Sequence, residues 1–295
     1  MMAPRGPMMS VALFVLSVAA LLAYAGLHIA HAAWPAQLGA LAFPVTVYVV
    51  AHALRAIRLG VLLGADRARN LLGLYFYTAG CSAIIPFKLG ELVRINEIAW
   101  WVGGYWRGLL IVWIERVFDV VALGAMAYFI LASGAQEPKD IGLLLWVIAG
   151  FVFMTMLVFF VVPEQLSSLN LHVIRNYSGR KAIRILHILD SLHQLFDQVR
   201  PLLKGKVVTL ALLTFFIWSL ELLAMALLFE SNPWLGALTG LVQQFVAVLS
   251  DVSRTTSLAV QFETIKIVVL LGFGVIALLF YGRLRVRSFK GMADS

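Results

Sequence analysis

The chain has 295 residues, of which 62% are hydrophobic and 13% are charged, and its formal net charge is +8. This composition excludes an ordinary soluble protein and predicts a single polytopic membrane domain over residues 1–295. The basic excess fits loops that face anionic lipid better than a nucleic-acid partner, and the lone Cys81 excludes an internal disulfide and a cysteine-based metal cage.

The first two apolar segments are residues 8–27 and 38–63. We interpret the first as a retained transmembrane helix, although residues 30–32 also resemble a signal-peptide cleavage site, so a cleaved leader is the alternative. The second segment carries Arg55 and Arg58 near its end and runs into a basic stretch. That end is therefore predicted to be cytoplasmic.

A proline, a glycine and three charged residues interrupt the next apolar run, namely Pro86, Lys88, Gly90, Glu91 and Arg94. Pro86 should end or kink the incoming helix, and Gly90 allows a sharp turn before a second helix begins. If residues 71–87 crossed the membrane fully, the basic segment 175–206 would later lie outside, against the positive-inside tendency. We therefore expect residues 71–101 to form a re-entrant hairpin that enters from the cytoplasmic side.

The restarted helix after this break is suited to bind an anion. It offers free backbone N–H groups and the positive end of its dipole, with Lys88 just before it and Arg94 one turn in. A solvated helix start at the interface is the simpler interpretation. The cost of charged groups at membrane depth favours a phosphate-binding role.

The middle of the chain is expected to cross the membrane three times, over residues 109–131, 143–162 and 207–229. Between the second and third crossings, residues 180–200 show the apolar spacing of an amphipathic helix on the cytoplasmic side. The third crossing contains Glu221, which is a candidate for proton coupling or, more simply, for pairing with Arg254 or Lys266.

A second broken hairpin is expected near the end of the chain. Polar residues 250–257 interrupt an apolar run, and the basic tail 283–287 should be cytoplasmic. Residues 234–258 would then be re-entrant from outside, with 263–281 as the last crossing. The predicted fold is an all-α bundle of six transmembrane helices and two oppositely oriented re-entrant hairpins, as in inverted-repeat transporters.

The two breaks share a local pattern. Glu91-x-x-Arg94 follows the first break and Glu263-x-x-Lys266 follows the second. We expect the breaks to meet near the membrane centre, with Glu91 and Glu263 on the walls of one cavity and each paired with a cation, because unpaired carboxylates there are costly.

Further charged residues lie at helical spacing. Glu115, Arg116 and Asp119 share one side of a helix. We expect the two acids to pair with Arg94 or Arg116 and hold the inner hairpin, while Arg116 either joins them or also reaches a ligand. Arg55 and Arg58 either snorkel to the interface or contact a phosphate; in the first case they would be no part of a site.

Two motifs resemble a known family. Residues 85–94 read Ile-Pro-Phe-Lys-Leu-Gly-Glu-Leu-Val-Arg, and Glu115-Arg116-Val117-Phe118-Asp119 follows. In this order and spacing they resemble the flippase-like integral membrane family, which includes the transmembrane region of bacterial lysylphosphatidylglycerol synthases. The family typically shows a Pro/Gly-rich break before a glutamate near the C-terminus. Here Glu263 is present, but residues 251–256 contain no proline or glycine.

The resemblance implies a protein of the bacterial inner membrane that moves an anionic lipid or a lipid-linked phosphate between leaflets, and the charge pattern places both termini in the cytoplasm. The expected substrate-binding residues are Lys88, Glu91, Arg94, Arg116, Arg254, Glu263, Lys266 and Arg55. The expected structural or coupling residues are Glu115, Asp119, Glu221, Pro86 and Gly90.

Two other functions stay open: an enzyme or enzyme subunit that uses a polyprenyl-phosphate-linked donor, and a scaffold for envelope-lipid synthesis. A second copy of the chain or a lipid-synthesis enzyme is a candidate partner. The six scattered histidines lack metal-ligand spacing, and Cys81 has no evident base in sequence. The sequence therefore predicts no catalytic residue, metal or cofactor.

Overall fold

The computed structural model describes residues 7–31, 38–64, 68–84, 90–133, 141–161, 201–229, 233–249 and 257–293, with isolated positions between 165 and 199. Over these residues the chain is all-helical and has no strand. The helices are α1 (Pro7–His31), α2 (Leu38–Leu63), α3 (Ala68–Ile84), α4 (Gly90–Val102), α5 (Tyr105–Ala132), α6 (Ile141–Met156) with a π-helical end η2 (Leu157–Val161), α9 (Val207–Ala226), α10 (Pro233–Leu249) and α11 (Ser257–Ala293). Most of the predicted amphipathic segment 180–200 lies outside this description.

Five helical stretches are long and apolar enough to cross a membrane, which indicates an integral membrane protein. They are Ser10–Leu27, Gly39–Leu63, Ile141–Phe159, Val207–Ala226 and Gln261–Gly282. Each corresponds to one of the six predicted crossings. The sixth corresponds to α5, which is long enough with 28 residues but carries Glu115, Arg116 and Asp119 in one turn. A crossing by α5 stays a prediction.

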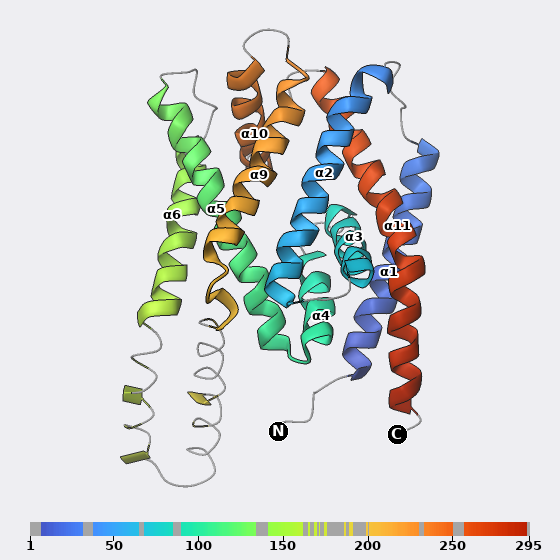
Figure 1. The fold of residues 1–295 in the computed structure, drawn as a ribbon, viewed down its shortest axis with the longest axis vertical. Coiled ribbons are helices and arrows are strands. Elements are labelled where there is room, and N and C mark those ends of the chain that lie inside the picture. Colours follow the sequence, from blue (N-terminus) through green and yellow to red (C-terminus); the bar gives the residue numbers. More distant parts are fainter. Residues whose placement is uncertain are drawn as a thin grey trace.

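The shortest helices are α4 with 13 residues, α6 with 16 before it continues into η2, and α3 and α10 with 17 each. At a rise of about 1.5 Å per residue, α4 is roughly 20 Å long, less than a hydrocarbon core of about 30 Å. Helix α4 lies in the lower half of the bundle and α10 in the upper half, while α1 begins and α11 ends at the same lower end (Figure 1). Both chain breaks lie outside the described residues, so the re-entrant paths stay predictions.

Helix α3 lies inside the bundle, where it contacts α11, α4, α2 and α1 (Figure 1). Small residues allow its close crossing with α11: a Cβ added at Gly80 would lie 3.3 Å from the Cα of Gly274. Beside it, α2 packs along α9. The buried side chains of α3, such as Tyr75 and Tyr77, therefore pack within the core.

Helix α4 is wedged between α3 and α5. A Cβ added at Gly90 would lie 2.4 Å from the Cα of Ser82 on α3, and one added at Gly108 on α5 would lie 2.7 Å from the backbone N of Ala99 on α4. Only glycine allows both approaches without a shift of backbone. The tight fit on both sides fixes the charged first turns of α4 against α5.

Candidate functional site

The charged residues of α2, α4 and α5 meet in one cluster inside the bundle. We call it the ionic network and define it as Arg58, Glu91, Arg94, Glu115, Arg116 and Asp119. Three arginines face three carboxylates, so the formal charges of this set cancel. Two of its acidic members, Glu115 and Asp119, lie near the middle of α5 and are buried, which places the network inside the helix bundle.

Arg58 of α2 is the most deeply buried cation of the network, with 2% of its surface exposed. Its Nη1 and Nη2 donate to Asp119 Oδ1 and Oδ2 at 2.7 and 3.0 Å, and its Nη1 also donates to Thr214 Oγ1 of α9 at 3.0 Å. Its Nε lies 3.7 Å from Glu115 Oε1. The prediction that Arg58 snorkels to the interface is therefore wrong. Two carboxylates compensate the charge, so the side chain has no need to reach water.

Arg94 ties α4 to α5. Its Nη2 donates to Glu115 Oε2 at 2.6 Å, which confirms the predicted pairing, and its guanidinium lies 5.7 Å from the centre of the Tyr75 ring on α3. Its Nε is buried and has no hydrogen-bond partner. A buried N–H donor without an acceptor is costly, so this atom is a natural position for an acceptor supplied by a ligand.

Arg116 is the accessible cation of the network, with 40% of its side chain exposed. It pairs with Glu91 of α4 through Nη2 and with Asp119 through Nη1, at 3.3 Å in the second case. Glu91 keeps its second oxygen, Oε2, buried and without a hydrogen-bond partner. This edge of the network is thus the most exposed, and it holds one of the buried polar atoms that lack a hydrogen-bond partner.

A second group of polar residues continues along α2. Arg55 pairs with Glu221 of α9 at 2.7 Å and lies 3.4 Å from His52 Nε2. The other ring nitrogen of His52 lies 2.8 Å from the Tyr75 hydroxyl. The predicted pairing of Glu221 with Lys266 is therefore wrong, and Arg254, the other predicted partner, lies outside the described residues. Because α2 packs along α9, Arg55 lies within reach of Glu221.

Lys266 instead pairs with Glu263 on its own helix, α11, at 2.6 Å. Its Nζ lies 5.2 Å from the ring centres of both Tyr48 and Phe262, a cation–π arrangement. Glu263 is thus paired with Lys266, and Glu91 is paired with Arg116. The prediction that each of these two carboxylates has a cation is confirmed. The cavity expected to join Glu91 and Glu263 stays a prediction, and Lys88 and Pro86 lie outside the described residues.

Sequence reasoning missed one fully buried acid, Glu97 of α4. Its Oε1 accepts from Asn96 at 2.8 Å, and its Oε2 accepts from the Tyr281 hydroxyl of α11 at 2.7 Å. Its position three residues after Arg94, within an apolar helix, was a usable signal. His52, three residues before Arg55, carried a similar one.

The described side chains offer no cluster of three or more His, Cys, Asp or Glu that could hold a metal ion. What they offer is a set of paired arginines and carboxylates that can exchange partners with an anion. No family model, curated protein or solved structure matches the chain.

Proposed function

We propose that the protein moves an anionic lipid, or a lipid-linked phosphate, between the two leaflets of a membrane. In this proposal the ionic network receives the phosphate. The resemblance of residues 85–94 and 115–119 to the flippase-like family supports it, as does the concentration of arginine in an otherwise apolar bundle. Ionisable groups at such depth are costly and usually serve a function.

The observation that carries the proposal is the state of Arg94. Its Nε is a buried donor without an acceptor. Arg116, the outer member of the same ionic network, has 40% of its side chain exposed. A phosphate that enters beside Arg116 would supply acceptor oxygens to both guanidinium groups. Arginine suits this role because its planar fork matches the oxygens of a phosphate.

Binding would require an exchange of partners. The network is formally neutral, so an added phosphate must displace a carboxylate, and Glu91 is the best candidate because it holds Arg116 by one oxygen at the exposed edge. Lys88, two residues before α4 in the sequence, would add positive charge. The displaced carboxylate gives the lipid-bound and lipid-free states different contacts, which any conformational switch needs.

The proposed topology places this site in a six-crossing protein of the bacterial inner membrane with both termini in the cytoplasm. The lower end of the bundle, where α1 begins and α11 ends, would be the cytoplasmic side (Figure 1). Helices α3 and α4 would form the hairpin from that side and α10 would begin the hairpin from the other. The breaks near Pro86 and Arg254 would carry the lipid past the middle of the membrane.

The test is lipid movement by purified protein in vesicles. Fluorescent phosphatidylglycerol is placed in both leaflets, and its chemical bleaching from outside reports exchange. We expect Arg94→Ala to lose a charge-assisted contact of roughly 1.5–3 kcal/mol, a decrease of about ten- to a hundredfold in rate. Arg94→Lys should recover only part of the lost rate, because lysine keeps the positive charge but lacks the planar guanidinium group that binds two phosphate oxygens.

Arg107→Ala is the matched control, since Arg107 is an exposed arginine at the start of α5 outside the network. It should leave the rate unchanged. The proposal fails if folded Arg94→Ala protein moves phosphatidylglycerol as fast as the wild type. It also fails if the wild type moves fluorescent phosphatidylcholine equally fast, because the protein would then not select an anionic head group.

A further inference from the structure

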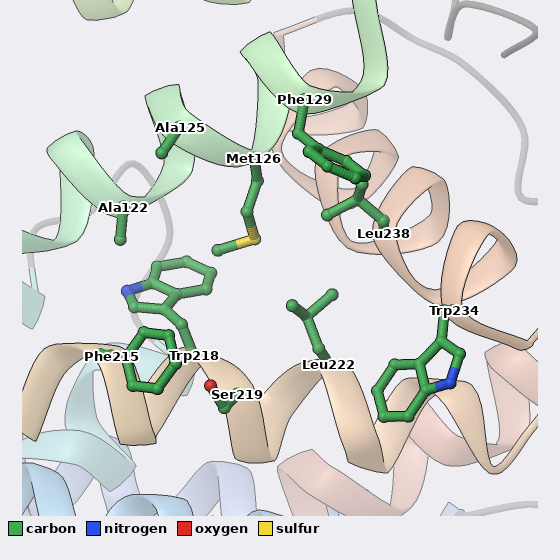
Figure 2. A pocket seen from close by; sticks show the side chains of 10 residues that line it. All are labelled: Ala122, Ala125, Met126, Phe129, Phe215, Trp218, Ser219, Leu222, Trp234 and Leu238. Atoms are coloured by element: carbon green, nitrogen blue, oxygen red, sulfur yellow. The ribbon is translucent and has the colours of Figure 1, made fainter. Parts of the chain in front are cut away.

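An apolar groove lies between α5, α9 and α10, with a volume of about 390 Å³. Its walls are aliphatic and aromatic apart from one hydroxyl, that of Ser219 (Figure 2). Ala122, Ala125, Met126 and Phe129 line it from α5, Phe215, Trp218, Ser219 and Leu222 from α9, and Trp234 and Leu238 from α10. Trp218 and Trp234 stand at opposite ends, and Met126 and Leu222 point into the space between them (Figure 2).

The groove continues the face of α5 that carries the ionic network. Glu115, Asp119, Ala122, Met126 and Phe129 follow one another at spacings of four, three, four and three residues, which places them in one stripe along the helix. The first two belong to the network and the last three line the groove. The groove therefore begins within about one turn of Asp119.

Helix α9 repeats this arrangement. Thr214 accepts a hydrogen bond from Arg58 of the network, and Trp218, one turn further, lines the groove. Trp218 is only 5% exposed, although Phe215 and Phe216 in the preceding turn of the same helix are 65% and 53% exposed. On both helices a charged or polar turn is followed directly by an apolar wall.

This juxtaposition fits an amphiphile. We propose that the groove holds one hydrocarbon chain of the same lipid whose phosphate occupies the ionic network. This inference rests on the proposed function. The proposed function places the phosphate of the lipid, and this inference adds a site for one of its hydrocarbon chains. The groove has more than twice the volume of the roughly 150 Å³ apolar cavity that is known to stay dry and bind benzene. A hydrocarbon chain gains contacts there that water would not supply.

The groove also explains how an anionic head group can be selected within a membrane. A chain held beside Met126 and Trp218 would keep the phosphate within reach of Arg58 and Arg94 rather than free to diffuse in the leaflet. The chain supplies contact area and the arginines supply charge recognition. A soluble phosphate without a chain should accordingly bind far more weakly than a two-chain lipid with the same head group.

The experiment uses the full chain in lipid nanodiscs that contain phosphatidylglycerol with a photoactivatable diazirine near the end of one acyl chain. After irradiation, mass spectrometry maps the labelled residues. We expect labelling to concentrate on groove residues, at least fivefold above exposed apolar residues elsewhere such as Trp146 and Phe153. Equal labelling at both places would overturn the proposal, because the groove would then hold only bulk lipid.

Ala122→Phe fills the groove, and Val121→Phe is its matched control. Val121 is the neighbouring residue of α5, does not line the groove and is 56% exposed. Ala122→Phe should reduce groove labelling at least fivefold and Val121→Phe should leave it unchanged. A smaller substitution, Ser219→Leu, tests the same space from α9 if the phenylalanine prevents folding. Undiminished labelling in folded Ala122→Phe or Ser219→Leu protein would contradict the assignment.

Two outcomes separate this inference from the proposed function. If groove labelling persists with a diazirine phosphatidylcholine and in Arg94→Ala protein, the chain site stands, and the phosphate site of the proposed function fails. If Arg94→Ala slows the movement of phosphatidylglycerol while the groove shows no enriched labelling, the proposed function stands and the chain site fails.

Discussion

The same sequence pattern occurs twice in this molecule with two different outcomes. In Glu91-x-x-Arg94, each residue pairs with α5: Glu91 contacts Arg116, and Arg94 donates to Glu115 at 2.6 Å. In Glu263-x-x-Lys266, the two residues pair with each other on α11, also at 2.6 Å. The first pattern joins helices, whereas the second compensates charge within a single helix.

The difference follows from what lies opposite each pattern. Helix α4 faces α5, whose middle turns carry Glu115, Arg116 and Asp119. Lys266 faces the rings of Tyr48 and Phe262. Across from Lys266 lies Tyr48 of α2, and Lys266 takes its carboxylate from its own helix, one turn away. The pairs of α4 should therefore determine how helices pack, and the pair of α11 should be separable from the fold.

Loss of Glu115 should produce the largest effect. Glu115 is 1% exposed and compensates both Arg58 and Arg94. Glu115→Gln would leave buried arginine charge without a carboxylate, and we expect its free energy of unfolding to decrease by about 3–5 kcal/mol. Denaturant titration of the protein in detergent micelles, followed by circular dichroism, measures this change.

Glu263→Gln is the comparison, because it removes the same group from the local pair. Glu263→Gln should decrease the free energy of unfolding clearly less than Glu115→Gln does. If the two substitutions destabilise the protein equally, the distinction between pairs that join helices and a pair within one helix is wrong.

The close approach of α4 to α3 should produce the next largest effect. Gly90→Ala would place a Cβ 2.4 Å from the Ser82 Cα, so the backbone must move. The shift would displace the first turn of α4, and with it Glu91 and Arg94, relative to α5, and we expect a loss of about 1–3 kcal/mol in the free energy of unfolding. Thermal unfolding in detergent micelles measures it.

Gly272→Ala of α11 is the matched control. A Cβ there meets no atom within 4 Å, and alanine favours a helix interior by roughly 0.5–1 kcal/mol over glycine. Gly272→Ala should therefore be neutral or stabilising. A Gly90→Ala protein as stable as Gly272→Ala would show that the junction between α3 and α4 can relax and does not fix the network.

The sequence predicted the helices better than the contacts between them. Apolar runs between polar breaks marked α2 with its observed bounds, Leu38–Leu63, and Gly90 marked the beginning of α4. The last crossing, predicted over residues 263–281, agrees with the apolar stretch Gln261–Gly282, and the helix that contains it, α11, continues on both sides from Ser257 to Ala293.

Pairing was less predictable because it depends on which helix faces which. Of the α5 acids, Glu115 was correctly expected to hold Arg94, and Asp119 instead pairs with Arg58 and Arg116. Glu221 was assigned to the wrong cation, because nothing in the sequence shows that α2 packs along α9 and brings Arg55 to it. The burial of Glu97 depends in the same way on Tyr281 of α11, 184 residues away.

The smallest effect on stability is expected when both members of the local pair are removed together. Lys266→Gln alone leaves Glu263 without its cation in an apolar helix, and Glu263→Gln alone leaves the cation. The double variant removes both charges, and loss of a whole pair is often close to neutral. We expect it to unfold within about 1 kcal/mol of the wild type. The equivalent double variant of Glu91 and Arg116 should lose more free energy of unfolding, because Arg116 also holds Asp119 at 3.3 Å.

If the Glu263 and Lys266 double variant is folded, its movement of phosphatidylglycerol in vesicles shows whether this pair takes part in transport. A decrease in rate without a decrease in stability would assign the pair to the lipid path. A double variant that is destabilised as much as Glu115→Gln would instead show that Glu263 and Lys266 support the packing of α11, and the contrast between the two patterns would be lost.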